Sequence, residues 1–403
     1  MPEPVIVATA RSPIGRAFKG SLVDLRPDDF AATIVRAALD KVPDLPRDQI
    51  DDLLLGCGLP GGEQGFNMAR VVALLAGLDN VPGATITRYC SSSLQTIRMA
   101  AHAIKAGEGD AFIAAGVECV SRFAKGNSDS WPDTQNPVFG EAGMRSLQRS
   151  EGGQGPWTEP DGLPDVYIAM GQTAENVAEI EKVTREEMDE FASLSQNRAV
   201  ESQSNGFFER EITPVTVPDG TVVSKDDGPR PDTTVEKLAQ LKPVFRPDGT
   251  ITAGNACPLN DGAAAVIVMS DTLARDLGIT PLARVVASGV TALNPEIMGL
   301  GPIGASRQAL DRAGMTIDDV DLVEINEAFA AQVIPSARAL EIPWDKLNVN
   351  GGGIALGHPF GMTGARIMTT LLNGLEDAGK TVGLETMCVG GGQGMAMVVE
   401  RVN

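Results

Sequence analysis

Residues 37–57 read AALDKVPDLPRDQIDDLLLGC, and residues 308–326 read QALDRAGMTIDDVDLVEIN. Each stretch has the apolar spacing of a helix that ends in Ala-Leu-Asp and a basic residue. An acidic turn and then a short apolar strand follow in both. The two stretches therefore repeat each other, although they lie in opposite halves of the chain.

Two further pairs of segments repeat in the same order. The helix and strand after Cys90, which end in GDAFIAAGVE, resemble residues 361–388, and DGAAAVIVMS at 261–270 resembles QGMAMVVE at 393–400. Helices that alternate with nearly continuous apolar strands are typical of α/β layers with buried sheets. The sequence therefore predicts an internal duplication, in which two similar α/β halves pack against each other.

The first half is interrupted before its last strand. A stretch rich in Gly, Pro, Asp and Glu separates that strand from the rest and far exceeds a normal loop, so we interpret it as an inserted subdomain. The predicted division is residues 1–120 with 252–273 for the N-terminal core half, 121–251 for the inserted loop domain, and 274–403 for the C-terminal core half.

The insertion is expected to be mostly irregular. Its sequence favours helices at 170–180 and 184–203 and loops at 126–143 and 149–165. An irregular insertion beside a doubled core commonly covers a site.

The composition limits the classes of protein and partner. The net charge of −20 argues against nucleic-acid binding, because a phosphate backbone would be repelled. The five cysteines form no Cys-x-x-Cys pair and only two histidines are present, so we predict no metal site, and the odd cysteine count favours a reducing compartment. We see no signal peptide and no run near the ~20 apolar residues of a membrane span, so we expect a cytoplasmic protein.

The stretch ITRYCSSSLQ at 86–95 places Cys90 between an expected strand and an expected helix. Unpaired backbone N–H groups and the helix dipole at such a junction favour a thiolate. A buried structural cysteine followed by a serine-rich cap explains the same residues, since free cysteine is among the most buried residue types. This stretch alone leaves both interpretations open.

Three stretches of the second half carry further polar or reactive groups. Asn326 follows the strand DLVEI, where open α/β sheets bind ligands, although a capping role would also explain it. His358 lies in the glycine-rich run 351–366, at a strand-to-helix turn equivalent to that of Cys90, and the run lacks the Gly-Lys of a phosphate-binding loop. Cys388 precedes three glycines, whose N–H groups could face an oxyanion or simply form a tight turn.

Together these groups form a coherent set for one chemistry. A Cys–His pair activates sulfur as a nucleophile, and a second thiol can move a proton. Glycine-rich backbone and an amide can stabilise an enolate or a tetrahedral oxyanion. We therefore predict acyl transfer through a thioester.

The chain resembles the thiolase family from ATARSPIG near its start to GGGQGMAM near its end. Blocks similar to those of thiolases occur in thiolase order: GEQGFNMARVVALLAG, CSS, GVE, MGQTAENVA, TAGNACPLNDGAAA, INEAFA, GGGIALGHPFGMTGAR and CVGGGQG. The resemblance implies the duplicated thiolase fold, in which the two α/β halves form a layered αβαβα core and the insertion forms the loop domain that holds CoA.

The resemblance also implies roles for the reactive groups. Cys90 is expected to take the acyl group and His358 to activate it, while Cys388 protonates departing acetyl-CoA and, in reverse, abstracts a proton from its methyl group. Asn326 is expected to hold a water that forms one oxyanion hole with His358. The backbone N–H groups of Cys90 and Gly390 are expected to form the other.

CoA and acyl-CoA are implied as substrates, with no tightly bound cofactor. The positions that fall where family members line CoA or the acyl tunnel are Met170, Arg230, Phe245, Ala253, Cys257, Ala328 and Phe329. Three positions depart from the usual family pattern, because Thr87 stands where Asn is usual, Ser93 where Gly is common and Cys257 where Ser is common. These departures leave the local hydrogen bonds open.

The type of thiolase is predicted from Ala169, where biosynthetic acetoacetyl-CoA thiolases typically carry His. A small residue leaves room for a longer acyl chain, which favours a degradative 3-ketoacyl-CoA thiolase of fatty-acid β-oxidation. The alternatives are an acetoacetyl-CoA thiolase, a condensing synthase on the same fold, which would lack Cys388, and a non-catalytic acyl-CoA or lipid carrier. The family implies a homodimer or homotetramer, and a β-oxidation hydratase/dehydrogenase subunit is a candidate partner.

Overall fold

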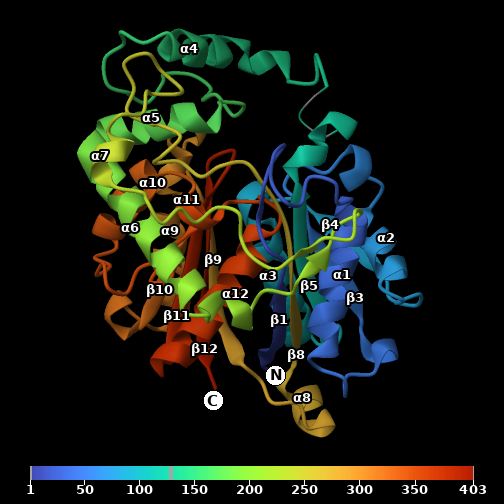
Figure 1. Cartoon of the computed structure of the whole chain (residues 1–403). Helices are drawn as coiled ribbons and strands as arrows, with labels where there is room; N and C mark the ends of the chain where they lie inside the picture. The colour runs from blue at the N-terminus through green and yellow to red at the C-terminus, as the bar shows by residue number, and fades with distance from the viewer. Residues whose placement is uncertain (1, 127–128, 130, 403) are drawn as a thin grey trace.

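The computed structural model describes residues 2–402 apart from 127, 128 and 130. Its main sheet takes strands from both halves, hydrogen-bonded in the order β10-β11-β12-β9-β1-β8-β5-β3-β4, with the short β2 on β8 (Figure 1). These strands are β1 (Pro4–Arg11), β2 (Gly15–Arg16), β3 (Asp52–Gly56), β4 (Gly83–Ile86), β5 (Ala111–Cys119), β8 (Asn260–Ser270), β9 (Ala283–Ala292), β10 (Leu322–Ile325), β11 (Val382–Val389) and β12 (Gln393–Arg401).

The two halves of this sheet have the same strand order, which confirms the predicted duplication. In the first half β3 pairs in parallel with β4 and β5, and β8 pairs antiparallel with β5 and β1. In the second half β10 pairs in parallel with β11, and β12 pairs antiparallel with β11 and β9. The counterpart of β4 is reduced to one parallel bridge between Val323 and Leu347. The half-sheets join where β1 meets β9.

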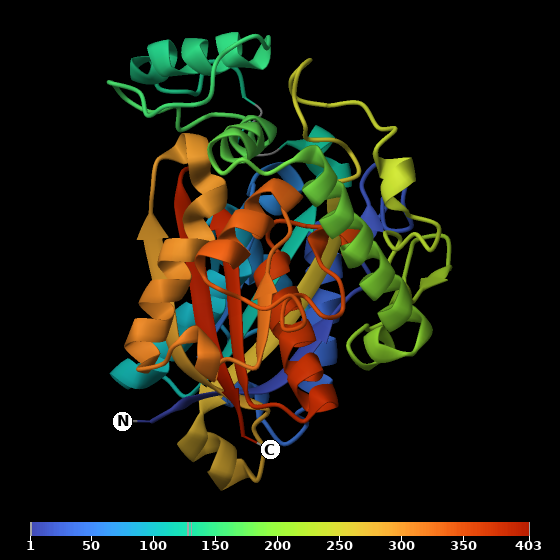
Figure 2. The ribbon, with the colours of Figure 1, turned by 90° about the vertical axis from the view of Figure 1, so that its left-hand side faces the viewer.

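Helices cover both outer faces and fill the space between the half-sheets, which gives the expected αβαβα layers (Figures 1 and 2). Helices α1 (Pro27–Asp40) and α2 (Met68–Leu75) lie on the first half-sheet, and α9 (Gly301–Ala313) and α10 (Ala330–Ala339) on the second. Helices α3 (Ser92–Ala106) and α12 (Thr363–Ala378) form the middle layer. Because successive side chains of a strand point to opposite faces, β8 is buried on both sides and reads as one apolar run.

The insertion lies between the ends of β5 and β8, and its described residues add no strand to the main sheet. It contains α4 (Gly140–Ser150), α5 (Met170–Ile180), α6 (Arg185–Ser204), α7 (Val235–Leu238) and a two-stranded sheet of β6 (Val215–Thr216) and β7 (Val222–Val223). Helices α4 and α5 lie over one end of the doubled core (Figure 1). The buried Arg11 of β1 anchors the insertion through ion pairs of 2.6 Å to Glu211 and 2.8 Å to Asp226. The three-part division at 120, 251 and 273 stays a prediction.

Both helices predicted in the insertion are confirmed. Helix α6 begins with a capping box, in which the Thr184 side chain accepts from the Glu187 N–H and the Glu187 carboxylate accepts from the Thr184 N–H. The loop predicted at 126–143 is wrong over its last residues, because Asn136 caps a 3₁₀ turn that continues into α4 at Gly140. Residues 127, 128 and 130 of that loop lie outside the described residues.

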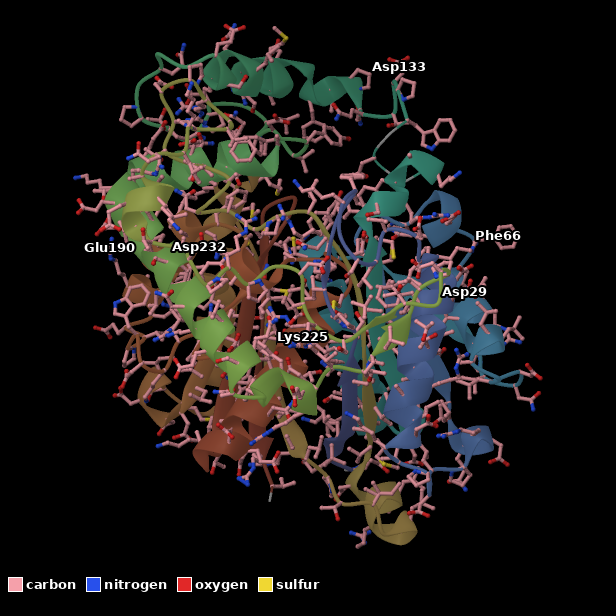
Figure 3. The ribbon with its side chains drawn as sticks, viewed as in Figure 1. Asp29, Phe66, Asp133, Glu190, Lys225 and Asp232 are labelled. Atoms are coloured by element: carbon pink, nitrogen blue, oxygen red, sulfur yellow. The ribbon has the colours of Figure 1, made fainter. Side chains whose placement is uncertain are left out.

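The remaining elements are short. They are α8 (Asp271–Leu277), α11 (Gly353–Leu356) and the 3₁₀ turns η1 (Arg47–Gln49), η2 (Gly62–Gln64), η3 (Tyr89–Ser91), η4 (Val120–Lys125), η5 (Pro137–Phe139), η6 (Phe207–Arg210), η7 (Pro295–Leu300) and η8 (Ile317–Asp319). Acidic side chains such as Asp29, Asp133, Glu190 and Asp232 point outward, as does Phe66 (Figure 3). Within the described part of the chain, every helix is too short or too polar to cross a membrane.

Candidate active site

Cys90 lies where the edge strand β4 turns into helix α3. The turn is the 3₁₀ segment η3, and Tyr89 adopts a left-handed φ of 42° immediately before the cysteine. Thr87, where the family usually has Asn, donates a hydrogen bond of 2.9 Å from its hydroxyl to the Gly58 carbonyl. The threonine therefore fixes this turn to the loop after β3, which accounts for one of the three departures.

Burial dominates the electrostatics of Cys90, which is 8% exposed. It raises the pKa of the thiol to about 11, while hydrogen bonds from the backbone N–H groups of Gly390 and Cys90 oppose that rise. The thiol is therefore neutral in the free protein. The two N–H groups that the sequence assigned to an oxyanion hole both reach this sulfur.

Gly390 belongs to a tight turn between β11 and β12. Gly391 and Gly392 have left-handed φ values of 77° and 81°, and a Cβ on Gly392 would lie 2.3 Å from the Leu293 carbonyl oxygen, so this turn requires glycine. Cys388 is the penultimate residue of β11 and is fully buried. The tight turn therefore holds the Gly390 N–H at the sulfur of Cys90.

The thiols of Cys388 and Cys257 both lie close enough to Cys90 for its charge to raise their pKa values. Burial raises the pKa of the Cys388 thiol well above its usual value, and the thiols of Cys90 and Cys257 raise it further. Burial and then Cys90 raise the pKa of Cys257. The structure therefore gathers three neutral thiols, of which Cys257 stands where family members have serine, and its backbone N–H donates 3.0 Å to the Ala328 carbonyl.

His358 precedes helix α12, the counterpart of α3 in the second half. The expected strand before it is wrong, because the chain passes from the Leu347 bridge through the short α11. The Thr363 hydroxyl donates to the Pro359 carbonyl at 2.8 Å, so it accepts from Nδ1–H of His358 at 2.6 Å. This fixes the tautomer and leaves a lone pair on Nε2.

The His358 ring is 1% exposed. Burial, followed by the positive charge of Arg366, lowers its pKa to about 3, so the imidazole is neutral at pH 7. Asn326, the residue after β10, lies 3.2 Å from Nε2 through its Nδ2 atom. The Asn326 backbone carbonyl accepts from Gln332 at 2.9 Å, which holds the amide at the sheet end.

Two buried glutamates hold the loops around these groups. Glu118 accepts from the N–H of Gly58 at 2.6 Å and of Gly361 at 2.9 Å, and so ties the loop after β3 to the turn that follows His358. Glu327 accepts from Ser195 at 2.6 Å, which ties the insertion to the end of β10. Neither role was predicted, although both glutamates lie in quoted sequence blocks.

A cavity of about 500 Å³ opens beside Cys90. Its wall combines the turns of the core with the insertion, through the side chains of Leu59, Tyr89, Asp129, Thr134, Gln135, Val166, Tyr167, Ile168, Ala169, Met170 and Phe360. The described lining residues include no Arg, Lys or His. Phe360 also contacts the His358 ring, with centroids 5.2 Å apart, so it joins the histidine to the cavity of Cys90.

Of the seven positions expected to contact CoA or the acyl chain, four belong to one apolar cluster: Met170, Phe245, Ala328 and Phe329. Met170 lines the cavity, and the rings of Phe245 and Phe329 pack edge to face at 6.1 Å. Arg230 and Ala253 are exposed on the surface of the insertion and of the chain that returns from it. The remaining two, Cys257 and Ala328, are joined by their backbone hydrogen bond.

Two residues at the site were not predicted as functional. Thr363 orients His358, and Tyr89 contributes both its strained backbone and a cavity wall. The hydroxyl of Thr363 lies five residues after His358 in the quoted GHPFGMTG run, so its spacing could have suggested contact across the start of the helix. No sequence signal marks the positive φ of Tyr89.

A buried thiol beside two backbone N–H donors, a neutral imidazole whose Nε2 lone pair faces the Asn326 amide, and a second thiol suit covalent acyl transfer. On a duplicated αβαβα fold, they define an acyltransferase of the thiolase class.

The chain belongs to the thiolase family, since residues 4–272 match the thiolase N-terminal domain and residues 279–401 the thiolase C-terminal domain. It is 44% identical over 415 residues to a 3-oxoadipyl-CoA/3-oxo-5,6-dehydrosuberyl-CoA thiolase of Escherichia coli, with 100% of both chains covered. It is 42% identical over 413 residues to a 3-ketoacyl-CoA thiolase of Bacillus subtilis, with 99% of this chain and 100% of that one covered.

Two solved structures have the same fold as this chain. The acetyl-CoA acetyltransferase of Bacillus anthracis matches with a TM-score of 0.86 and 38% identity over 100% of this chain and 99% of that one. The dimeric peroxisomal thiolase of Saccharomyces cerevisiae matches with a TM-score of 0.89 and 33% identity over 99% of this chain and 97% of that one.

Proposed function

We propose that this thiolase cleaves 3-ketoacyl-CoA esters of uncharged acyl chains with CoA, giving acetyl-CoA and a shortened acyl-CoA, as in fatty-acid β-oxidation. The observation that carries the proposal is the cavity beside Cys90, which holds about 500 Å³ and whose described lining offers several apolar side chains and no cation. A carboxylate at the far end of an acyl chain would find no countercharge there, and burying it unpaired is costly.

In the proposed first step, Nε2 of His358 takes the proton of Cys90 while its sulfur attacks the 3-keto carbon. The N–H groups of Cys90 and Gly390, or the pair of His358 and Asn326 with its water, stabilise the oxyanion. The bond between carbons 2 and 3 then breaks, and the acyl group stays on Cys90. The departing acetyl-CoA carbanion takes a proton from the thiol of Cys388.

In the second step the thiol of a new CoA loses its proton to the Cys388 thiolate and attacks the acyl-Cys90 carbonyl. The tetrahedral intermediate collapses, the carbon–sulfur bond to Cys90 breaks, and the Cys90 sulfur takes back the proton held by Nε2 of His358 as the shortened acyl-CoA leaves. The two oxyanion sites suit the two carbonyl carbons that are attacked or formed in one cycle.

CoA is proposed to enter between the insertion and the core. Met170 at the start of α5, which lines the cavity, the Phe245–Phe329 pair and the Cys257–Ala328 segment are proposed to line its path toward the cysteines. Arg230 and Ala253, both exposed, are proposed to meet the nucleotide end, where one cation suits a phosphate despite the overall negative charge.

The names of similar proteins favour a second candidate substrate, 3-oxoadipyl-CoA, whose acyl chain ends in a carboxylate. Thiolysis of 3-oxohexanoyl-CoA and of 3-oxoadipyl-CoA compares the same chain length without and with that charge. We expect kcat/KM to be at least about tenfold higher for 3-oxohexanoyl-CoA, given the cost of an unpaired buried charge. The reverse ranking would assign the chain to carboxylate-ended substrates.

Acetoacetyl-CoA is the third substrate to compare, because it has the short acyl chain of the biosynthetic reaction. Ala169 lines the cavity where biosynthetic relatives typically carry His, so a cavity of this size favours longer chains. A higher kcat/KM for acetoacetyl-CoA than for 3-oxohexanoyl-CoA would support the biosynthetic alternative instead.

A homo-oligomer is proposed from the edge of the main sheet. Strand β4 ends the sheet with all four residues partly exposed, and Phe66 beside it is 97% exposed. An open edge next to an apolar side chain suits pairing with a second copy. The number of subunits and association with a hydratase/dehydrogenase stay predictions.

A further inference from the structure

A second cavity lies on helix α3, well away from Cys90. It holds about 380 Å³ and is bordered by α3, strands β9 and β12, and the end of α9. Arg98 is eight residues beyond Cys90, so a rise of 1.5 Å per residue puts the near end of this cavity about 12 Å from the thiol along the helix. It belongs to neither the acyl cavity nor the proposed path of CoA.

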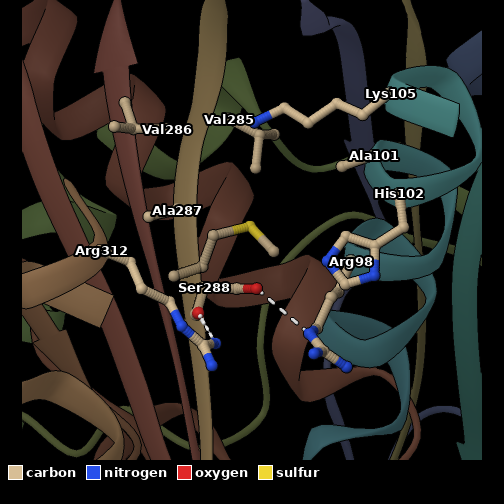
Figure 4. A pocket seen from close by; sticks show the side chains of 10 residues that line it. Arg98, Ala101, His102, Lys105, Val285, Val286, Ala287, Ser288 and Arg312 are labelled. Carbon is tan, nitrogen blue, oxygen red and sulfur yellow. Dashed lines mark hydrogen bonds between the residues drawn. The ribbon is translucent and has the colours of Figure 1, made fainter. Parts of the chain in front are cut away.

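Four basic side chains face this cavity. Arg98, His102 and Lys105 come from α3 and Arg312 from α9 (Figure 4). Val285 and Met397 add apolar surface to the lining, which we call the Val285–Met397 floor. The lining residues include no Asp or Glu. The chain has 53 acidic and 33 basic side chains, so a typical patch of its surface should contain carboxylates. A cluster of basic side chains without a carboxylate therefore calls for an explanation.

The two arginines are held but not neutralised. Nε of Arg98 donates 3.1 Å to the Ser288 hydroxyl, and Arg312 donates 2.7 Å to the Ser288 carbonyl, so both guanidinium groups flank one residue of β9 (Figure 4). Among the described residues, no ion pair involves any of the four basic side chains of the cavity.

The pKa values of Arg98 and His102 are lowered by burial and by the neighbouring positive charges. Burial, then the charges of Arg88 and Arg312, lower the pKa of Arg98. Burial, then Arg98, Lys105 and Arg312, lower the pKa of His102. Lys105 and Arg312 lie near the C-termini of α3 and α9, where the helix dipole favours a positive charge. This explains one cation on each of the two helices. It does not explain why all four converge on one cavity.

The positive charges of the arginines and of Lys105 lie at opposite ends of this cavity. The arginines flank Ser288, whereas Lys105 extends to Val285 (Figure 4). Ser288 is three residues after Val285 along strand β9, which is about 10 Å at 3.3 Å per residue. We propose that this cavity binds an elongated small molecule with a phosphate group at each end. The arginines bind one phosphate through their remaining N–H groups, Lys105 binds the other, and the Val285–Met397 floor contacts the uncharged middle.

Calorimetric titration of the full-length protein with fructose 1,6-bisphosphate at constant ionic strength tests this. We expect saturable binding of one molecule per chain, weakened about tenfold or more in Arg98→Gln, in Arg312→Gln and in Lys105→Gln, as for loss of a charge-assisted hydrogen bond. Arg275→Gln is the matched control, because Arg275 is an exposed cation on α8 whose partner Asp276 is 3.9 Å away. It should bind like the unchanged protein. Three different positions keep the test valid if one variant does not fold.

The absence of saturable binding would overturn the proposal. So would binding that survives all three substitutions, which would place it at the CoA site, and stronger binding of adipate, which would assign the cavity to dicarboxylates. Inorganic phosphate should bind more weakly than the bisphosphate, and equal affinity would contradict the two-ended site. If the substitutions instead dissociate an oligomer, carboxylates of a second copy cover the cations and the small-molecule assignment is wrong.

Discussion

The two halves differ most in the connection between their last two equivalent strands. In the second half, β11 and β12 are joined by Gly390, Gly391 and Gly392 alone, whereas in the first half residues 120–259 lie between β5 and β8. Both connections reach Cys90: the short one supplies an N–H to its sulfur, and the long one supplies most of the cavity wall. The duplicated scaffold thus delivers two equivalent positions to one site. In the proposed function, the short connection serves the chemistry and the long one selects the substrate.

The residues just before the two equivalent helices, α3 and α12, also differ between the halves. Helix α3 follows the thiol of Cys90 and α12 follows the imidazole of His358, but the two helices are not independent. Ser93, at the start of α3, accepts from the N–H of Ala365 at 2.9 Å and so caps α12 from the other half. The relative position of nucleophile and base therefore depends on a contact that exists only when both halves are assembled.

The largest effect is expected from removing the chemistry at the first helix start. Cys90→Ala should lower kcat/KM for 3-ketoacyl-CoA thiolysis by at least about 10⁴-fold, because no other group in the proposed cycle carries the acyl group. Steady-state thiolysis measures this. Cys257→Ala is the matched control, since its thiol is nearby but has no proposed step, and an equal loss there would contradict the assignment of the nucleophile.

At the second helix start the expected effect is smaller. Thr363→Val removes the acceptor for Nδ1–H of His358 and should lower kcat by up to about 10²-fold through misorientation of the ring, with little change in KM. Thr363→Ser keeps the hydroxyl and should restore most of the activity. Loss in the serine variant as large as in valine would indicate that Thr363 acts through packing.

The long connection is tested by filling the cavity that it walls. Ala169→Leu should lower kcat/KM for 3-oxodecanoyl-CoA by about tenfold or more and leave acetoacetyl-CoA nearly unchanged, because the added atoms occupy only the space of a long chain. A uniform loss across chain lengths would show that residue 169 acts on the catalytic groups.

The pH dependence of Cys90 tests its neutral state in the free enzyme. With its pKa raised to about 11 and that of His358 lowered to about 3, no thiolate–imidazolium pair forms at neutral pH. The rate of alkylation by iodoacetamide should therefore rise about tenfold per pH unit between pH 7 and 9, in proportion to the thiolate fraction. A plateau below pH 8 would mean that the pair is ionised.

The smallest effect is expected at the departures from the family pattern. Ser93→Ala leaves the N–H of Ala365 at the start of α12 without its acceptor and should lower the free energy of unfolding by about 1 kcal/mol. Chemical denaturation measures this, and Ser91→Ala, whose hydroxyl bonds only within its own turn, is the control. No difference between the two would remove Ser93 from the link between the halves.

The fold was predictable because repeated segments carry their periodicity with them. The pair AALDK and QALDR marked equivalent helices, and the structure even repeats the 3₁₀ turns η1 and η8 between helix and strand. The strand before His358 was predicted wrongly, because symmetry was extended to a segment where glycine replaces apolar residues. Helix α4 was missed because its start was assigned to a loop from the Gly, Pro and Asp content of residues 126–143, and because Ala142 is its only buried residue.

The site was predictable as residue types but not as contacts. Cys90, Asn326 and Cys388 stand out in sequence because each lies at or just beyond the end of a strand, and His358 stands out because it is in a glycine-rich run before a helix. The pairing of Thr363 with His358 and the capping of α12 by Ser93 depend on tertiary packing, which one-dimensional spacing does not encode. The same is true of Thr87, whose bond to Gly58 crosses between two loops.

The central claim is that one cysteine from the first half carries the acyl group while one from the second half moves a proton. Peptide mass spectrometry of the Cys388→Ala variant after brief incubation with acetyl-CoA tests it most directly. The account predicts an acetyl group on Cys90 in this variant, together with thiolysis slowed by about 10²- to 10⁴-fold. An acetyl group on Cys257, or no adduct on Cys90 in a folded protein, would contradict it.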